Sequence, residues 1–342
     1  MKTVKGFVRL VGAGIVSVGI ICLLLCFYNI MPVHIENKKG NTDYVWPANS
    51  VWVKATEGIS FGKFDANGYN NLSVTENPDI IVLGSSHMEA CEVMQDESAA
   101  YLLAQKLNGK YTVYNMGISG HDFYKVCQYL PENLGLNDAV PKVVVIETST
   151  VNVSEENVDE ILSHTVEFTP SHNTGVIGTL QKIPFCRAVY HQAEGGLLKL
   201  FMPDSGSSSN QTTAEDTYAE TEIDGLAYNE LFSYLKDMED KYGTQIIICY
   251  HPTEKLMDDG TVSFDSDEHL TAFKEYADKY GISFVDMTDR FENMYYKEHY
   301  VAHGFCTGEL ATGHLNKYGH AAMADEIYNE INNLEEAGEL CQ

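Results

Sequence analysis

The sequence predicts an α/β protein with a parallel sheet between two layers of helices, preceded by one transmembrane helix. The sheet is predicted by short, β-branched apolar runs that alternate with helix-like stretches. Continuous runs of this length are typical of strands covered on both faces. The helix-like stretches, such as 96–109 and 228–243, end in glycine, and repeated strand–helix units indicate a doubly wound sheet. The five predicted strands are 79–84, 111–117, 142–148, 244–252 and 282–287.

The transmembrane helix is predicted over residues 10–31, which contain no charged residue. As a helix this stretch would be about 33 Å long, enough to cross a bilayer. Lys2, Lys5 and Arg9 precede it, so the positive-inside rule places residues 1–9 in the cytoplasm and the body outside. A cleaved signal peptide is the alternative, but the apolar run is long for one and lacks a small-x-small site. We therefore expect a single-pass cell-membrane protein with an extracytoplasmic domain.

The charge of the chain is strongly negative, at −27. All 49 acidic residues lie beyond residue 31, with 19 of the 22 basic ones, so the body carries a charge near −30. Nucleic acid is excluded as a partner because phosphate binding requires clustered Lys and Arg. Anionic headgroups would repel such a body, so we expect it to project away from the membrane rather than lie on it.

Beyond the anchor we expect two parts. Residues 32–77 form a lead-in segment of short strands or hairpins, and residues 78–338 form the α/β domain. Within that domain, residues 165–222 interrupt the strand–helix rhythm and are polar and acidic, which predicts an insertion or flexible loop.

The cysteines argue against a metal centre built on thiolates. The chain has eight, and none form a CxxC pair. The usual zinc spacing is therefore absent, and several cysteines sit in apolar runs that are typical of a core. We expect no disulfide framework, no metal and no organic cofactor.

Two segments carry residues suited to nucleophilic catalysis. Ser86 follows the first predicted strand in "DIIVLGSSHMEAC", at the strand end where α/β sheets bind ligands. His314 lies in "GHLNKYGHAAMADEI", on a short loop before a helix that Asn316 can cap. A serine hydroxyl becomes a good nucleophile when a positioned imidazole takes its proton. This pair therefore predicts a Ser–His centre, if the fold brings the two segments together.

Three motifs in this order, "IVLGSSH", "NMGISGHD" and "HLNKYGHAAMA", resemble the first, second and last blocks of the SGNH/GDSL hydrolase family. The resemblance covers residues 78–335 and implies a flavodoxin-like domain. It also implies that Ser86 is the nucleophile and first oxyanion donor, that Gly120 supplies a second N–H to the oxyanion, and that His314 is the general base.

Two departures from the family pattern leave roles open. Asn152 lies one position too far after the third strand for the family's oxyanion asparagine, so Thr148, Ser149 or Thr150 are alternatives.

Ala311 stands where the family has an aspartate, and Glu309 is the nearest acid. Either Glu309 orients His314, or a backbone carbonyl does, or the site works as a dyad; a site that has lost activity is a further alternative.

Four other histidines need an interpretation. His87, beside the nucleophile, and His251, at the end of the fourth strand, are expected to line the pocket, whereas His303 and His320 are interpreted as structural. His314 and His320 are six residues apart, which is not the spacing of a zinc pair on one helical face.

The function predicted from these features is a serine-dependent acyl esterase or O-acyltransferase, with acetyl as the expected group, acting on a cell-envelope glycan. Its partners would be an acylated glycan or acyl donor and a membrane protein for acyl transfer. The alternatives are a lipolytic esterase of the same fold and a catalytically inactive envelope or glycan-binding protein. The missing aspartate favours the inactive alternative, since a fold does not guarantee a function.

Overall fold

All five predicted strands form, and they make one parallel sheet. A computed structural model describes residues 2–26, 30–55, 57–136, 138–163, 225–265, 267–305 and 309–340. The strands lie in the order β11–β8–β7–β5–β6, and each neighbouring pair is parallel. The second strand in the chain is thus at one edge and the first is next to it, which is the flavodoxin-like order. Their bounds are β5 (Ile80–Leu83), β6 (Val113–Asn115), β7 (Val143–Thr148), β8 (Gln245–Tyr250) and β11 (Ser283–Asp286).

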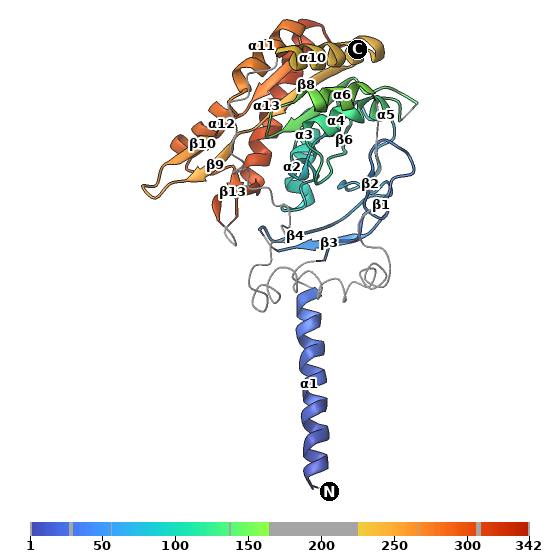
Figure 1. Ribbon diagram of the computed structural model, residues 1–342, viewed down its shortest axis with the longest axis vertical. Coiled ribbons are helices and arrows are strands. Elements are labelled where there is room, and N and C mark those ends of the chain that lie inside the picture. The colour runs from blue at the N-terminus through green and yellow to red at the C-terminus, as the bar shows by residue number, and fades with distance from the viewer. Residues whose placement is uncertain are drawn as a thin grey trace.

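Helices cover both faces of this sheet (Figure 1). On one face, α3 (Ala99–Leu107), α12 (Thr288–Asn293) and α13 (Lys317–Ala337) pack through one apolar cluster. On the other, α4 (Phe123–Gln128), α5 (Leu130–Leu134), α6 (Glu155–Ser163), α10 (Gly225–Tyr242) and α11 (Leu270–Tyr280) share a second cluster. Because β7 and β8 lie in the middle of the sheet, their apolar runs are buried from both sides.

The lead-in segment forms two antiparallel hairpins that pack against the domain. They are β1 (Ile35–Glu36) with β2 (Tyr44–Val45), and β3 (Val51–Lys54) with β4 (Ser60–Lys63). Trp46, Trp52 and Phe64 form a small core there with Cys91 of the α/β domain. In Figure 1 the β3–β4 hairpin lies between the N-terminal helix and the rest of the domain.

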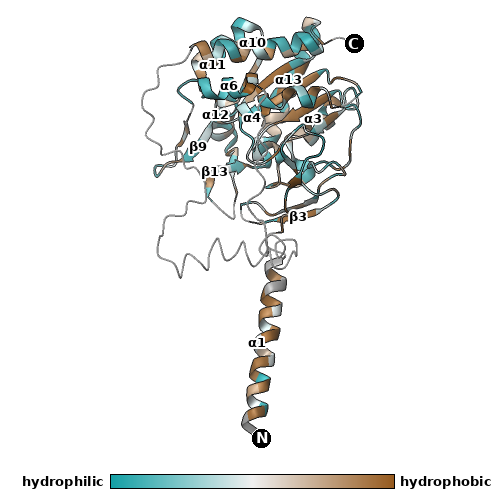
Figure 2. Cartoon of the chain, turned by 45° about the vertical axis from the view of Figure 1, so that its right-hand side comes forward, coloured by the Kyte–Doolittle hydropathy of each residue, from teal (hydrophilic) through white to brown (hydrophobic). Residues whose placement is uncertain are grey.

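The N-terminal helix α1 runs from Lys2 to Cys26, so it starts earlier and ends earlier than predicted. The basic tail continues the helix because Lys and Arg favour helix. Its described side chains are exposed and mostly apolar, and Figure 2 shows it as a separate, largely hydrophobic rod. Residues Val4–Ile21 are long and apolar enough to span a membrane.

The chain is tied to the domain directly after this helix. Ile30 and Val53 exchange two backbone hydrogen bonds of 2.7 and 2.8 Å, which fixes Ile30 beside strand β3.

Two further hairpins complete the described fold at the carboxyl edge of the sheet. They are β9 (Thr253–Leu256) with β10 (Val262–Asp265), and β12 (His303–Gly304) with β13 (Leu310–Leu315). A four-residue helix α2 (Ser86–Glu89), the 3₁₀ turn η1 (Gln95–Glu97) and the π-helical turn η3 (Met294–Glu298) account for the rest. The insertion expected at 165–222 lies outside the described residues.

Candidate active site

Ser86 stands at the carboxyl end of strand β5, in the turn that leads into helix α2. Ser85 caps that helix, and its backbone N–H and hydroxyl donate to the Glu147 carboxylate at 2.8 and 3.0 Å. A Cβ at Gly84 would collide with that carboxylate, so this close approach requires glycine. The Glu147 carboxylate therefore holds the turn through Ser85, and Ser86 is the first residue of helix α2.

His314 reaches Ser86 from the opposite end of the chain. Its Nε2 lies 2.9 Å from the Ser86 Oγ. The histidine is part of strand β13, not of the short loop that the sequence predicted. Asn316 does cap helix α13, since its side chain accepts from the N–H groups of Tyr318 and Gly319 at 2.9 and 3.3 Å. His314 is thus near the end of strand β13, just before the capped start of helix α13.

The acid beside this histidine is Glu57, from the connection between β3 and β4. Both of its carboxylate oxygens lie 2.9 Å from His314 Nδ1, and one also accepts from the His314 backbone N–H at 2.9 Å. A Cβ at Gly313 would meet the same carboxylate at 2.7 Å, so a glycine there leaves room for it. Ser86, His314 and Glu57 form a continuous hydroxyl–imidazole–carboxylate chain.

The expectation that Glu309 orients His314 is not met. Glu309 is exposed at the start of β13, and it lines an open cleft with Thr253 and Lys255. Glu57 lies 2.9 Å from His314 Nδ1, and Glu92 lies 3.8 Å from the same nitrogen. No sequence signal pointed to Glu57, because the contact joins residues 257 positions apart and Glu57 lies outside the motifs.

The electrostatics of the Glu57–His314 pair favour a charged carboxylate next to a more basic imidazole. Burial lowers the pKa of His314, but its hydrogen bond to Glu57 and the charges of Glu92 and Glu57 outweigh burial and raise that pKa above its usual value. Burial raises the pKa of Glu57, and the hydrogen bond and charge of His314 lower it overall. The pair therefore stabilises the imidazolium that forms when His314 takes a proton.

A cleft of about 280 Å³ opens beside Ser86. Gly120, the second predicted oxyanion donor, is part of its wall. Gly120 has a φ of +84°, and the Tyr44 hydroxyl holds the adjacent Ser119 carbonyl at 2.5 Å. Within the described chain, the N–H groups of Ser86 and Gly120 donate to no protein acceptor. Both N–H groups are therefore available to a ligand in the cleft.

Asn152 does not take part in this cleft. It is exposed, and its backbone N–H donates to Asp267 at 3.2 Å. The loop after β7 turns away at that point because Asp267 also accepts from the Val151 N–H.

Among the alternatives, residues 148–150 all line the cleft. The Thr148 hydroxyl donates to the Thr150 carbonyl, and the Thr150 hydroxyl donates to Asp267. Ser149 therefore has the only hydroxyl of the three that makes no hydrogen bond to the described residues.

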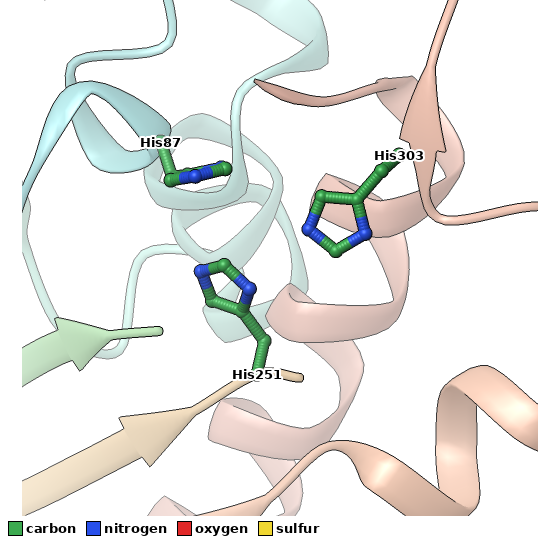
Figure 3. Close-up of side chains that lie close together, drawn as sticks. All are labelled: His87, His251 and His303. Carbon is green, nitrogen blue, oxygen red and sulfur yellow. The ribbon is translucent and has the colours of Figure 1, made fainter. Parts of the chain in front are cut away.

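The two histidines expected in the pocket have different places. His87 lines the cleft, and its Nδ1 accepts from the Leu315 N–H at 3.2 Å. His251 is fully buried beneath the cleft and does not line it, because its Nε2 lies 2.9 Å from the buried Glu147 carboxylate. His303 lies near both of them (Figure 3).

No protein-family model matches the chain. No curated protein matches it either. Among solved structures, it is similar to an acetyl xylan esterase, with 14% identity over 74% of this chain and 99% of that one, at a TM-score of 0.38. It is also similar to the periplasmic domain of a Salmonella ser. Paratyphi A lipopolysaccharide acetyltransferase, with 13% identity over 76% and 85% of the chains and a TM-score of 0.36. An acetylxylan esterase from Geobacillus stearothermophilus has 12% identity over 75% and 95%, at 0.38. Similarities this low leave the function to be argued from the site itself.

Proposed function

We propose that this protein is a serine-dependent acyl esterase or O-acyltransferase, with Ser86 as nucleophile and an acyl group on a cell-envelope glycan as its substrate. One observation carries the proposal: the 2.9 Å contact between Ser86 Oγ and a His314 ring whose other nitrogen is held by the Glu57 carboxylate. A hydroxyl with such a partner can attack an ester carbonyl, whereas a hydroxyl in a purely structural turn needs no base.

In the first step Ser86 Oγ attacks the ester carbonyl while His314 Nε2 takes its proton. Glu57 stabilises the imidazolium through Nδ1. When the tetrahedral intermediate collapses, His314 returns the proton to the departing sugar oxygen, and the acyl group stays on Ser86. Water then attacks the acyl-enzyme in an esterase, or a second sugar hydroxyl does so in a transferase, with His314 again acting as base.

The negative oxygen of the intermediate needs hydrogen-bond donors in the same cleft. The Ser86 and Gly120 N–H groups are two candidates, and neither has a protein acceptor among the described residues. We assign the third position to the Ser149 hydroxyl, in place of Asn152, since Ser149 lines the cleft and Asn152 does not.

The size of the cleft favours a short acyl group. Its volume of about 280 Å³ lies at the lower end of the range of ligand pockets. An acetyl group would fit there with part of a sugar ring outside, whereas a long fatty acyl chain needs an apolar channel. This favours acetyl chemistry over lipolysis.

The anchor supports an action close to the membrane surface. If α1 spans the bilayer, only four residue steps separate Cys26 from Ile30, a reach of at most about 14 Å. The β3–β4 hairpin exposes three large apolar side chains, Val51, Ile59 and Phe61. We propose, in contrast to the expectation from net charge, that this face of the hairpin rests on the lipid surface and brings the Glu57 turn, and so the site, close to it.

Position-specific quenching tests this placement in the full-length chain in nanodiscs that contain brominated lipid. Fluorescence from Phe61→Trp, taken as the difference from the parent protein, should be quenched. Val140→Trp, also at an exposed apolar residue, is the control and should be unaffected. Equal quenching at both positions, or at neither, would contradict the placement, and cleavage of α1 from the mature chain would remove its basis.

The function itself is tested by comparing ester substrates. We expect the protein to hydrolyse p-nitrophenyl acetate but little p-nitrophenyl palmitate. We also expect it to release or transfer the acetyl groups of an acetylated oligosaccharide. A preference for palmitate would favour the lipolytic alternative. Failure to turn over any acyl ester, with no covalent capture of Ser86, would leave the non-catalytic glycan-binding alternative.

A further inference from the structure

Three histidines that the proposed reaction does not use lie close together, one of them in the wall of the cleft (Figure 3). His87 comes from α2, His251 follows β8, and His303 belongs to β12. One nitrogen of each lies within 4.8 Å of the other two. Their ring centroids are 4.6, 5.3 and 5.7 Å apart. The fold thus brings three potential metal ligands together from distant parts of the sequence.

Two of these rings have a carboxylate on one side and an unpaired nitrogen on the other. Glu147 lies 2.9 Å from His251 Nε2, and Glu254 lies 3.3 Å from His303 Nδ1. His251 Nδ1 and both ring nitrogens of His303 are buried and have no hydrogen-bond partner among the described residues, so the Glu254 contact at His303 Nδ1 is an ion-pair distance only. A buried nitrogen without a partner is unfavourable, so these nitrogens favour a bound proton donor or cation.

The charges around the three rings favour a cation. The side chains of Glu147 and Glu254 are fully buried, and the described part of the chain pairs neither with Lys or Arg. Glu147 is hydrogen-bonded by Ser85 and lies 2.9 Å from His251. Glu254 accepts from the N–H groups of Ala302 and His303. A cation bound to the three imidazoles would therefore lie close to two buried carboxylates, which stabilise positive charge.

We propose that His87, His251 and His303 bind one divalent transition-metal ion, with Zn²⁺ as the best fit. Zinc–nitrogen bonds of about 2.0–2.1 Å in a tetrahedral site place the ring centroids about 5.2 Å apart, close to the mean of the three observed separations. Glu147 and Glu254 would hold the far nitrogens of two ligands, in the carboxylate–histidine–metal arrangement common in zinc sites. A water molecule would be the fourth ligand.

His87 must change its hydrogen bond for this site to form. Its Nδ1 accepts from the Leu315 N–H, so in the neutral ring Nε2 carries the proton. We propose that the His87 imidazole turns over about its bond to Cβ when the ion binds. The ring then loses the 3.2 Å hydrogen bond from Leu315, and an unprotonated ring nitrogen becomes free to bind the ion.

The ion would have a positioning role for the proposed reaction. His87 follows Ser86 directly, so a metal bound to His87, His251 and His303 would connect the turn that carries the serine to β8 and β12. The site is independent of the esterase proposal, since a chain without esterase activity could still bind the ion.

Metal content provides the direct test, on full-length protein purified in detergent without a polyhistidine tag. We expect about one zinc per chain by mass spectrometry of the metal. Replacement by Co²⁺ should give the visible absorption of a tetrahedral nitrogen-ligated ion, and a chelator should lower the unfolding temperature. His303→Gln should lose the metal, whereas His320→Gln, another buried histidine outside the three, should keep it.

Three results would overturn the site. One is parent protein with no bound metal that also shows no cobalt absorption and no thermal shift with added Zn²⁺. Another is His303→Gln protein with unchanged metal content, and the third is equal metal loss in the His320→Gln control. If His303→Gln does not fold, the cobalt spectrum and the chelator response of the parent protein still decide.

Discussion

Two glutamate–histidine pairs lie close together in this molecule, and they differ in what the second nitrogen of the histidine contacts. Glu57 and Glu147 each lie 2.9 Å from a ring nitrogen, of His314 and His251 respectively. The other nitrogen of His314 contacts the Ser86 hydroxyl, and the His314 side chain is 25% exposed. The other nitrogen of His251 is buried and has no hydrogen-bond partner in the part of the chain that the structure describes. The carboxylate–imidazole pair is therefore shared, and access to a hydroxyl and a cleft distinguishes the proposed catalytic pair.

The largest expected effect separates the two serines next to these pairs. Ser86→Ala removes the proposed nucleophile, so kcat/KM for p-nitrophenyl acetate should fall by about 10³-fold or more. Ser85→Ala removes a hydroxyl bound to Glu147 and the cap of α2, and should cost less than about tenfold in kcat/KM, with a loss of about 1 kcal/mol in unfolding free energy. Similar losses of activity in both variants would contradict the distinction.

The second prediction concerns the acid of the proposed catalytic pair. Glu57→Gln should lower kcat/KM by about 10²- to 10⁴-fold, since the amide no longer stabilises the imidazolium. The base must be neutral to act, so activity rises as pH passes the His314 pKa, which Glu57 helps to raise. The acid limb of the pH–rate profile should therefore move to lower pH in this variant.

Glu309→Gln is the matched control for Glu57→Gln, because Glu309 is exposed and makes no contact with His314. It should leave both the rate and the acid limb unchanged. A loss with Glu309→Gln and none with Glu57→Gln would reinstate the expectation drawn from the sequence.

A smaller effect on activity than that of Glu57→Gln is expected at the buried pair. His251→Gln should lower the free energy of unfolding by about 1–3 kcal/mol, since Glu147 loses a buried partner. Its kcat/KM should fall less than that of Glu57→Gln, because the ring does not line the cleft and would affect Ser86 only through the proposed metal site. Denaturant unfolding and steady-state kinetics on the same preparation would check both. If His251→Gln lost more activity than Glu57→Gln, the distinction between a proposed catalytic pair and a buried structural pair would be wrong.

The sheet could be predicted from the sequence because each strand is a short apolar run bounded by turn residues, which is a signal in the local pattern. The strand end at Gly84 and the helix cap at Asn316 are local signals of the same kind, and they placed Ser86 and His314 at one edge of the sheet. Local pattern could not place Glu57, whose contact with His314 depends on how the lead-in hairpin packs against the domain.

Glu309 and Asn152 were expected at the site because each lies close to a motif along the chain. The path of the loops decides which side chains reach the site, and it brings Glu57 to His314 and leaves Asn152 outside the cleft. Asp267 draws the Asn152 backbone away from the cleft, and Glu57 fills the position expected for Glu309. The three clustered histidines also have no ligand spacing in the sequence, so only the fold brings them together.

Covalent capture by a fluorophosphonate shows whether His314 and Glu57 activate Ser86. Full-length protein treated with the probe, digested and sequenced by tandem mass spectrometry should carry one adduct, on Ser86 and not on the adjacent Ser85. His314→Gln should abolish that adduct, and Glu57→Gln should slow its formation. An adduct on Ser85, or labelling of Ser86 at an equal rate without His314, would contradict the account.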